Sequence, residues 1–278
     1  MITLENVSLG YDQQPVLSGV DLDTAPGMMI GLIGPNGSGK STLIKGINRV
    51  VNMFSGNVTI NGRDLKTLGR GELARLVATV PQNPVLPPAF TAFEVVLMGR
   101  TPHLGLLRYE SQKDMLVAWQ AMKATKTESL ADRRVGELSG GERQRLVIAR
   151  ALTQEAKAIL LDEPTANLDI NHQVEILNLV KGLCRKQGLT VIAALHDLNL
   201  AAQYCDSLIM LNGRQVYARG TPQEVLTPQN IREVYGADVY VIPHPVNQLP
   251  TTLVITGNGH DDFANSVFAQ GDIGGTAS

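Results

Sequence analysis

Short apolar runs alternate with stretches of helical periodicity along most of the chain. Residues 28–33 form an unbroken apolar run before Gly34, which predicts a buried strand. From Ser41 onward, apolar side chains recur at the spacing of one helix face, at Leu43, Ile44, Ile47, Val50 and Val51. Further strands are predicted at 1–9, 16–22, 57–60, 158–161, 189–195 and 207–211, and helices at 172–187 and between the last two strands. Strands that alternate with helices predict a largely parallel sheet of the α/β class.

A mostly helical block interrupts this alternation between about residues 86 and 152. It contains predicted helices at 92–98, 112–125 and 141–152, and prolines exclude a regular element over 81–88 just before it. We therefore interpret the block as an inserted subdomain. After Val241 the chain is rich in Pro, Gly, Asn, Thr and Asp, which predicts a mobile tail without assignable chemistry.

Composition narrows the class of protein. The length of 278 residues permits one large domain or two small ones, and the net charge of -2, with both signs mixed along the chain, excludes a nucleic-acid footprint. Cys184 and Cys205 lie far apart in apolar surroundings and are interpreted as reduced core thiols. We recognise no signal peptide and no apolar stretch of spanning length, so any membrane role is expected to act through a partner.

A glycine-rich loop joins the strand at 28–33 to the helix that begins at Ser41. Its glycines let backbone N–H groups face phosphates, Lys40 reaches the β- and γ-phosphates, and the Ser41 hydroxyl binds Mg²⁺. The positive end of the helix dipole adds to this attraction. An ordinary glycine turn is the alternative, but it does not account for the strand before the loop and the helix after it. The loop consists of Gly34, Pro35, Asn36, Gly37, Ser38, Gly39, Lys40, Ser41 and Thr42.

Two carboxylates end the apolar strand at 158–161. Asp162 is the natural partner for the Mg²⁺ of a bound nucleotide, and Glu163 is placed to position or polarise an attacking water. Taken alone, the pattern equally describes a strand followed by an acidic turn. A phosphate-binding loop needs a second metal anchor, so the two motifs together favour the functional interpretation.

A third segment begins a predicted helix with small residues. A serine and two glycines at a helix start form a further anion site. The alternative is a capping box, with Ser139 as the N-cap and Glu142 reaching back to it. Spacing alone does not separate these interpretations. The segment comprises Ser139, Gly140, Gly141 and Glu142.

Together these three segments resemble the ATPase subunits of ABC transporters. In that family the phosphate loop, the stretch Leu138–Glu142 followed by Arg143-Gln144-Arg145, and the Leu-Leu-Asp-Glu-Pro strand end occur in this order. The resemblance covers residues 2–240 and leaves out the tail, 241–278. It implies a P-loop NTPase (RecA-like) core with an antiparallel β subdomain, over about 1–85 and 153–240, and an inserted α-helical signature subdomain over about 86–152.

Four further positions match the family pattern. Tyr11 matches an aromatic that stacks on adenine, Gln82 the glutamine loop that contacts Mg²⁺ and water, Asp169 the loop after the catalytic glutamate, and His196 the switch histidine at the γ-phosphate. Their alternatives are a turn aromatic, a solvated loop residue, a helix N-cap and a core histidine. The resemblance implies that Glu163, His196 and Gln82 are catalytic and that Ser41, Gln82 and Asp162 hold Mg²⁺. It assigns ATP contacts to the phosphate loop, Tyr11, Asp169 and Ser139–Glu142.

The resemblance also implies binding partners and a cellular location. Such subunits form homodimers in which ATP lies between the phosphate loop of one chain and Ser139–Glu142 of the other. They bind polytopic permease subunits, and through them a solute-binding protein, at the cytoplasmic face of the inner membrane as peripheral proteins. No nucleic acid is expected.

Two stretches resemble one branch of this family. Residues 96–103 match the Val-x-x-Gly-Arg-x-Pro-His pattern of importers for iron–siderophores, haem and cobalamin, and residues 197–201 also match that branch. The alternative is that residues 96–103 only pack the subdomain. An exporter subunit would differ after Gln82, a P-loop kinase or GTPase would lack Ser139–Glu142, and a non-transport ABC ATPase remains the rival function.

Overall fold

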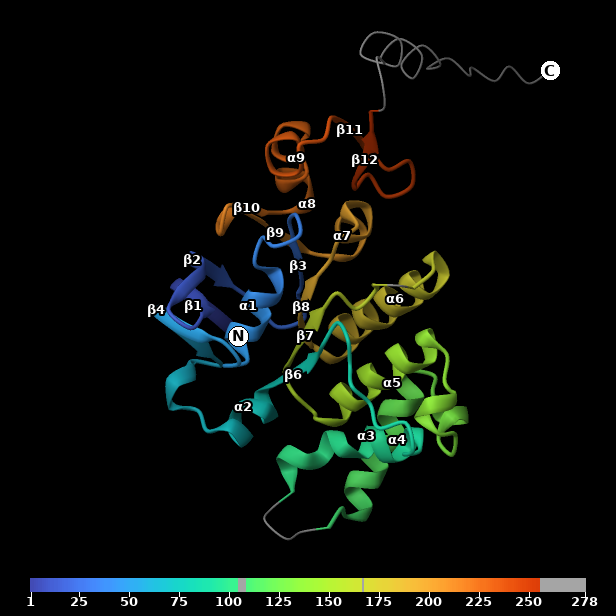
Figure 1. Ribbon diagram of the computed structural model, residues 1–278. Helices are drawn as coiled ribbons and strands as arrows, with labels where there is room; N and C mark the ends of the chain where they lie inside the picture. Colours follow the sequence, from blue (N-terminus) through green and yellow to red (C-terminus); the bar gives the residue numbers. More distant parts are fainter. Residues whose placement is uncertain (105–108, 167, 256–278) are drawn as a thin grey trace, which may run out of the picture.

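The computed structural model describes residues 1–104, 109–166 and 168–255. Its first sheet is antiparallel and has the strand order β2-β1-β4-β5. The strands are β1 (Ile2–Tyr11), β2 (Gln14–Asp23), β4 (Asn52–Ile60) and β5 (Arg63–Asp64). This sheet lies beside the central sheet, and helix α1 (Lys40–Ile47) packs between the two (Figure 1).

The central sheet has the order β10-β9-β3-β8-β7-β6, with β10 antiparallel at one edge and all the other pairs parallel. Both of its faces are covered, so its parallel strands are apolar at nearly every position. In β3, Met29 and Ile33 face one apolar cluster, and Ile30 and Leu32 face the other. The strands are β3 (Met29–Ile33), β6 (Val77–Val80), β7 (Ala158–Asp162), β8 (Thr190–Ala194), β9 (Ser207–Asn212) and β10 (Gln215–Gly220). The α/β prediction is confirmed.

Helices cover the face of the central sheet opposite α1. They are α6 (Ile170–Gln187), α7 (Leu198–Tyr204), α8 (Pro222–Val225) and α9 (Pro228–Tyr235). The short helices η1 (Leu65–Thr67) and α2 (Arg70–Leu76) lead into β6. Cys184 and Cys205 are free thiols in this layer, and burial raises their pKa values to about 11 and about 12. Within the described ranges, no helix combines the length and apolarity needed to cross a bilayer.

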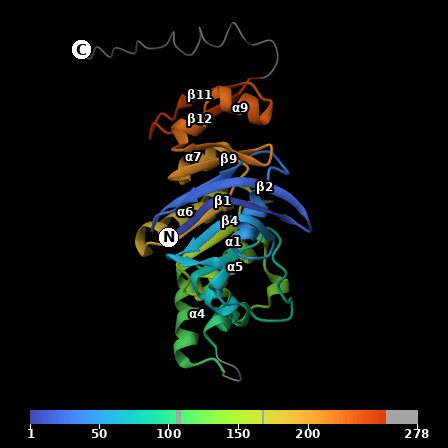
Figure 2. The same ribbon diagram turned by 90° about the vertical axis from the view of Figure 1, so that its left-hand side faces the viewer.

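The helical block has an apolar cluster of its own, formed by residues between Ala92 and Ala149. It lies at the opposite end of the molecule from α9, as both views show (Figures 1 and 2). Its helices are α3 (Ala92–Leu97), η2 (Met98–His103), α4 (Gln112–Ala124), η3 (Glu128–Leu130), η4 (Val135–Glu137) and α5 (Gly140–Thr153).

Two of the differences from the sequence-based expectation concern helix α1 and the tail. Helix α1 stops at Ile47 because Arg49 adopts a left-handed φ of 56°, and Val50 is therefore 68% exposed instead of facing inward. The expected tail begins with a hairpin of β11 (Val239–Pro243) and β12 (Pro250–Val254). Pro243 and Pro250 pair with each other at its end, where a missing N–H is tolerated. Residues 256–278 of the tail lie outside the described residues.

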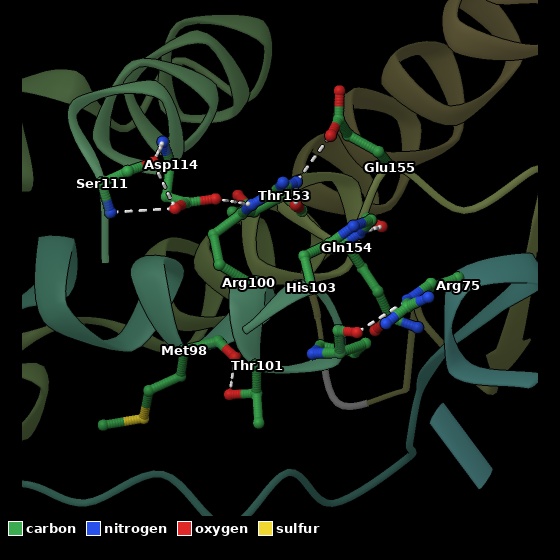
Figure 3. Close-up of polar contacts among 11 residues, drawn as sticks. Arg75, Met98, Arg100, Thr101, His103, Ser111, Asp114, Thr153, Gln154 and Glu155 are labelled. Carbon is green, nitrogen blue, oxygen red and sulfur yellow. Dashed lines mark hydrogen bonds and ion pairs between the residues drawn. The ribbon is translucent and has the colours of Figure 1, made fainter. Parts of the chain in front are cut away.

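A buried arginine in η2 links α4, the end of α5 and the loop that follows α5 (Figure 3). Arg100 is 3% exposed. Its Nε donates to Asp114 Oδ1 at 2.8 Å, and its guanidinium also donates to the Thr153 carbonyl at 2.9 Å and to Glu155 Oε2 at 2.6 Å. Hydrogen bonds from the Ser111 hydroxyl and backbone N–H, and then from Arg100, hold the pKa of Asp114 well below its usual range.

Further contacts tie α2 to the same junction. Arg75 Nε donates to the Pro102 carbonyl at 2.8 Å, and His103 Nε2 donates to the Gln154 carbonyl at 2.8 Å (Figure 3). Gln154 Nε2 donates in turn to the Val77 carbonyl at 3.0 Å, at the start of β6. Of the polar side chains in the stretch 96–103, Arg100 and His103 thus make contacts inside the protein, whereas Thr101 is exposed. The contacts of Arg75 and His103 connect the helical block to α2 and β6.

Replacing Arg100 with methionine is expected to lower the free energy of unfolding by about 3 kcal/mol, because the buried Asp114 carboxylate loses its cation. Urea denaturation measures the change. Arg63→Met is the matched control, since the Arg63–Glu72 pair has side chains 51% and 46% exposed and its loss should leave the free energy of unfolding close to the wild-type value. Equal destabilisation by the two substitutions would contradict the structural role of Arg100.

Candidate functional site

The phosphate loop adopts backbone angles that only glycine takes without strain. Gly34, Gly37 and Gly39 have φ values of 145°, 79° and 106°. A Cβ atom at Gly34 would also lie 2.3 Å from the carbonyl oxygen of Leu211, which is the last buried residue of β9. The loop is therefore pressed against the strand ends of the central sheet, and its conformation follows from its glycines.

Lys40 begins α1 with its side chain folded back over the loop. Its Nζ donates to the carbonyl oxygens of Gly34, at 2.7 Å, and Pro35, at 3.1 Å. Burial lowers the pKa of Lys40, while the negative charges of Glu163 and Asp162 oppose that shift. The ammonium group is thus held beside the acidic pair at the end of β7.

Asp162 and Ser41 meet across the mouth of the loop. The Ser41 hydroxyl donates to Asp162 Oδ1 at 2.8 Å. Burial raises the pKa of Asp162, the hydrogen bond from Ser41 lowers it, and the charge of Glu163 raises it further. This carboxylate is buried beside another acid, so a cation at this position would stabilise its charged form.

Glu163 is bound from both sides by residues that follow neighbouring strands. His196 Nε2 lies 2.6 Å from Glu163 Oε1, and Gln82 Nε2 donates to Glu163 Oε2. Gln82, Glu163 and His196 follow β6, β7 and β8, which are adjacent and parallel, so their carboxyl ends meet at one edge. Glu163 itself has a left-handed φ of 51°, an uncommon angle for a residue with a side chain.

A pocket of about 180 Å³ opens at this edge. Glu163 and the phosphate loop line it, together with Val16 of β2, which no sequence motif indicated. Val16 is distant from the loop in sequence and adjacent only in the fold, so no local signal could have found it. The full lining is Val16, Asn36, Gly37, Gly39, Lys40, Ser41, Thr42 and Glu163. Tyr11, at the end of β1, is 44% exposed and does not line the pocket.

Ser139–Glu142 lies at the start of α5 and does not line this pocket. Both hydrogen bonds of the capping box are present: Glu142 N–H donates to Ser139 Oγ at 3.3 Å, and Ser139 N–H donates to Glu142 Oε2 at 2.7 Å. The second of these bonds is the largest cause that lowers the pKa of Glu142. A Cβ at Gly140 would meet open space, whereas at Gly141 it would lie 2.5 Å from the His172 ring. The helix start is thus both capped and accessible at Gly140.

Asp169 caps the start of α6. Its Oδ1 accepts hydrogen bonds from the backbone N–H of His172 at 2.9 Å and from the His172 ring Nδ1 at 2.8 Å. These bonds lower the pKa of Asp169. The neighbouring Asn167 lies outside the described residues.

A protein-family model and several known proteins are similar to this chain. Residues 17–166 match the family model described as "ABC transporter". The chain is 39% identical to the achromobactin transport ATP-binding protein of Dickeya dadantii, over 90% of this chain and 93% of that protein. It is 39% identical to the hemin import ATP-binding protein of Bordetella avium (91% and 99%). It is 43% identical to the cobalamin import ATP-binding protein of Halobacterium salinarum (83% and 57%).

Solved structures agree with this family assignment. An ABC transporter of the metal-chelate type, in an inward-facing conformation, has a TM-score of 0.81 and 27% identity, over 92% of this chain and 97% of that chain. A dimeric ATP-binding cassette bound to ADP and Pi has a TM-score of 0.69 and 30% identity, over 80% and 99%. The predicted P-loop NTPase fold is thereby confirmed. The chain belongs to the ABC transporter family, as one of its ATP-binding and ATP-hydrolysing subunits.

Proposed function

We propose that this chain hydrolyses Mg²⁺-bound ATP between two copies of itself and thereby drives an importer for iron–siderophores, haem or cobalamin. One observation carries the catalytic part of this proposal. Side chains from the phosphate loop and from the ends of β6 and β8 converge on the Asp162–Glu163 pair at the end of β7, and Glu163 lines the pocket.

The residues at the pocket suit Mg²⁺. Ser41 Oγ and Asp162 Oδ1 are oxygen ligands held 2.8 Å apart, and Gln82 adds an amide oxygen on the same edge of the sheet. Mg²⁺ prefers oxygen donors and is held by few protein ligands when it binds with a nucleotide. The bound ion would neutralise charge on the β- and γ-phosphate oxygens.

The phosphate loop would bind the nucleotide itself. Backbone N–H groups at the start of α1 face the pocket with the positive end of the helix dipole. Lys40 would exchange its two carbonyl contacts for the β- and γ-phosphate oxygens, which carry full negative charge. Tyr11 has an exposed ring beside β2, available to stack on adenine.

Glu163 would position and polarise the attacking water. For this purpose one of its carboxylate oxygens must leave Gln82 or His196, and each of these side chains could then contact the metal-bound water or the γ-phosphate. The left-handed backbone at Glu163 points the carboxylate toward the pocket instead of continuing the strand.

A second copy of the chain would complete the site. The pocket at the phosphate loop is open, and Ser139–Glu142 presents an accessible helix start elsewhere on the surface. Opposed head to tail, two copies would bring Ser139, Gly140 and Gly141 of each to the γ-phosphate held by the other, with Asp169 near the contact. The dimeric cassette similar to this chain, bound to ADP and Pi, supports this arrangement.

The cargo class follows from the relatives and from the sequence branch. Relatives named for achromobactin transport, hemin import and cobalamin import are 39–43% identical. The same proposal places a core at about 1–85 and 153–240, a helical subdomain at about 86–152, and a segment of unassigned role at 241–278.

Permease subunits would dock on the helical subdomain, whose surface exposes Phe90, Met98, Met115, Leu116 and Trp119. The chain would then lie peripherally at the cytoplasmic face of the inner membrane, where the permease links it to a solute-binding protein.

Glu163→Gln is expected to lower the rate of ATP hydrolysis by about 10²–10⁴-fold while ATP binding persists, because the amide cannot accept a proton from water. The variant should accumulate as an ATP-bound dimer, measurable by light scattering during gel filtration. Glu72→Gln, which alters an exposed ion pair on α2, is the control and should hydrolyse ATP at the wild-type rate. Hydrolysis at the wild-type rate by Glu163→Gln would end the assignment.

Affinity purification of the tagged chain from detergent-solubilised membranes tests the transport role. Mass spectrometry is expected to find a polytopic permease and a solute-binding protein among the recovered proteins, because the helical subdomain presents an apolar docking surface. Recovery of only water-soluble partners, from a preparation that still hydrolyses ATP, would replace the importer with a non-transport function. Such a result would not contradict the assignment of the ATPase site.

A further inference from the structure

The side-chain amide of Asn199 joins the C-terminal hairpin to α7. Asn199 Oδ1 accepts hydrogen bonds from the backbone N–H of Thr252 at 2.7 Å and from its hydroxyl at 2.8 Å. Asn199 Nδ2 donates to the Thr252 carbonyl at 3.2 Å. Among the described residues, strand β12 pairs only with β11, so the Asn199 amide takes the place of a neighbouring strand at its other edge. Asparagine carries the donor and the acceptor that this pairing requires.

A second contact fixes the other end of α7. Asn247, in the turn between β11 and β12, donates to Gln203 Oε1 in the last turn of the helix. Figures 1 and 2 both show the hairpin lying along α7. The hairpin thus holds α7 at its first turn and at its last turn.

The hairpin is itself anchored to the core independently of α7. Helix α9, which leads into it, buries Ile231 and Val234 against the protein. Arg232 forms an ion pair with Asp238 just before β11, and the backbone N–H of Ile255 donates to the Asp238 carbonyl at 2.9 Å. The hairpin can therefore act as a fixed support against which α7 is positioned.

The position of α7 determines where His196 lies. Only residues 195–197 separate the end of β8 from the start of α7. Leu195 is buried, and Asp197 caps the helix by accepting the backbone N–H of Leu200 at 2.9 Å. The His196 side chain is 45% exposed, so its own surroundings hold it weakly. Its contact with Glu163 consequently depends on the backbone that β8 and α7 hold between them.

We propose that Asn199, through Thr252 of the C-terminal hairpin, is a positioning residue that fixes α7 and thereby aims His196 at Glu163 and the γ-phosphate. This inference rests on the role given to His196 in the proposed function. The hairpin and the stretch Asp197-Leu198-Asn199 would thereby affect the rate of hydrolysis without contacting the nucleotide. Loss of the amide leaves the hairpin folded on α9 but frees the first turn of α7.

Steady-state kinetics of Asn199→Ala test the proposal. We expect kcat for ATP hydrolysis to fall about tenfold or more, because small displacements of a catalytic group are costly. KM for ATP should stay within about twofold of the wild-type value, because the phosphate loop is unchanged. In nucleotide-free protein, the imidazole NMR signals of His196, identified by their absence in His196→Ala, should shift. Asn199→Gln, which keeps the amide, should recover part of kcat.

Asn230→Ala is the matched control. The Asn230 amide also donates to a backbone carbonyl in the C-terminal region, that of Val225, and none of its hydrogen bonds within the described part of the chain reaches α7. Its kcat and its His196 signals should match the wild type. If His196→Ala is impaired but Asn199→Ala keeps a wild-type kcat or unshifted His196 signals, the positioning role of Asn199 is overturned. A wild-type kcat in His196→Ala would instead overturn the role of His196 in the proposed function, and with it this inference.

Discussion

The repulsion between the adjacent carboxylates of Asp162 and Glu163 constrains the whole site. Two acids at the end of a buried parallel strand are unfavourable unless donors and cations face them. The fold supplies these groups from three separate elements. Helix α1 gives the Ser41 hydroxyl and the Lys40 ammonium, and the segments after β6 and β8 give the Gln82 amide and the His196 imidazole. In the proposed function, this negative centre binds a metal ion and phosphates, and each of its partners takes a second role once nucleotide binds.

The fold divides positioning among parts that are far apart in the molecule. The central sheet brings the ends of β6, β7 and β8 together, while the contacts of Arg75, His103 and Gln154 connect the helical block to α2 and β6. At the opposite end, the hairpin holds α7 through Asn199. The phosphate site and the Ser139 segment lie apart on the same chain, which suits a reaction shared between two copies.

The phosphate loop and the acidic strand end could be predicted because each is a contiguous motif with a short-range physical reason. The meeting of Gln82 and His196 at Glu163 could not be derived from periodicity, since it depends on β6, a four-residue strand that the apolar pattern did not indicate. The polar side chains of Arg100 and His103 carried the branch resemblance, yet they face inward. The hairpin was missed because its prolines resemble those of a loop, and Asn199 finds its partner 53 residues away.

In the proposed function, one chain holds only part of the ATP site and a second copy completes it. The direct measurement is ATP hydrolysis per chain at saturating Mg²⁺-ATP, followed over a wide range of protein concentration. Mass action predicts that activity per chain falls about tenfold for each tenfold dilution below the dimerisation constant and reaches a plateau above it. A constant activity per chain, at concentrations where light scattering detects only monomers, would show that one chain hydrolyses ATP without a second copy.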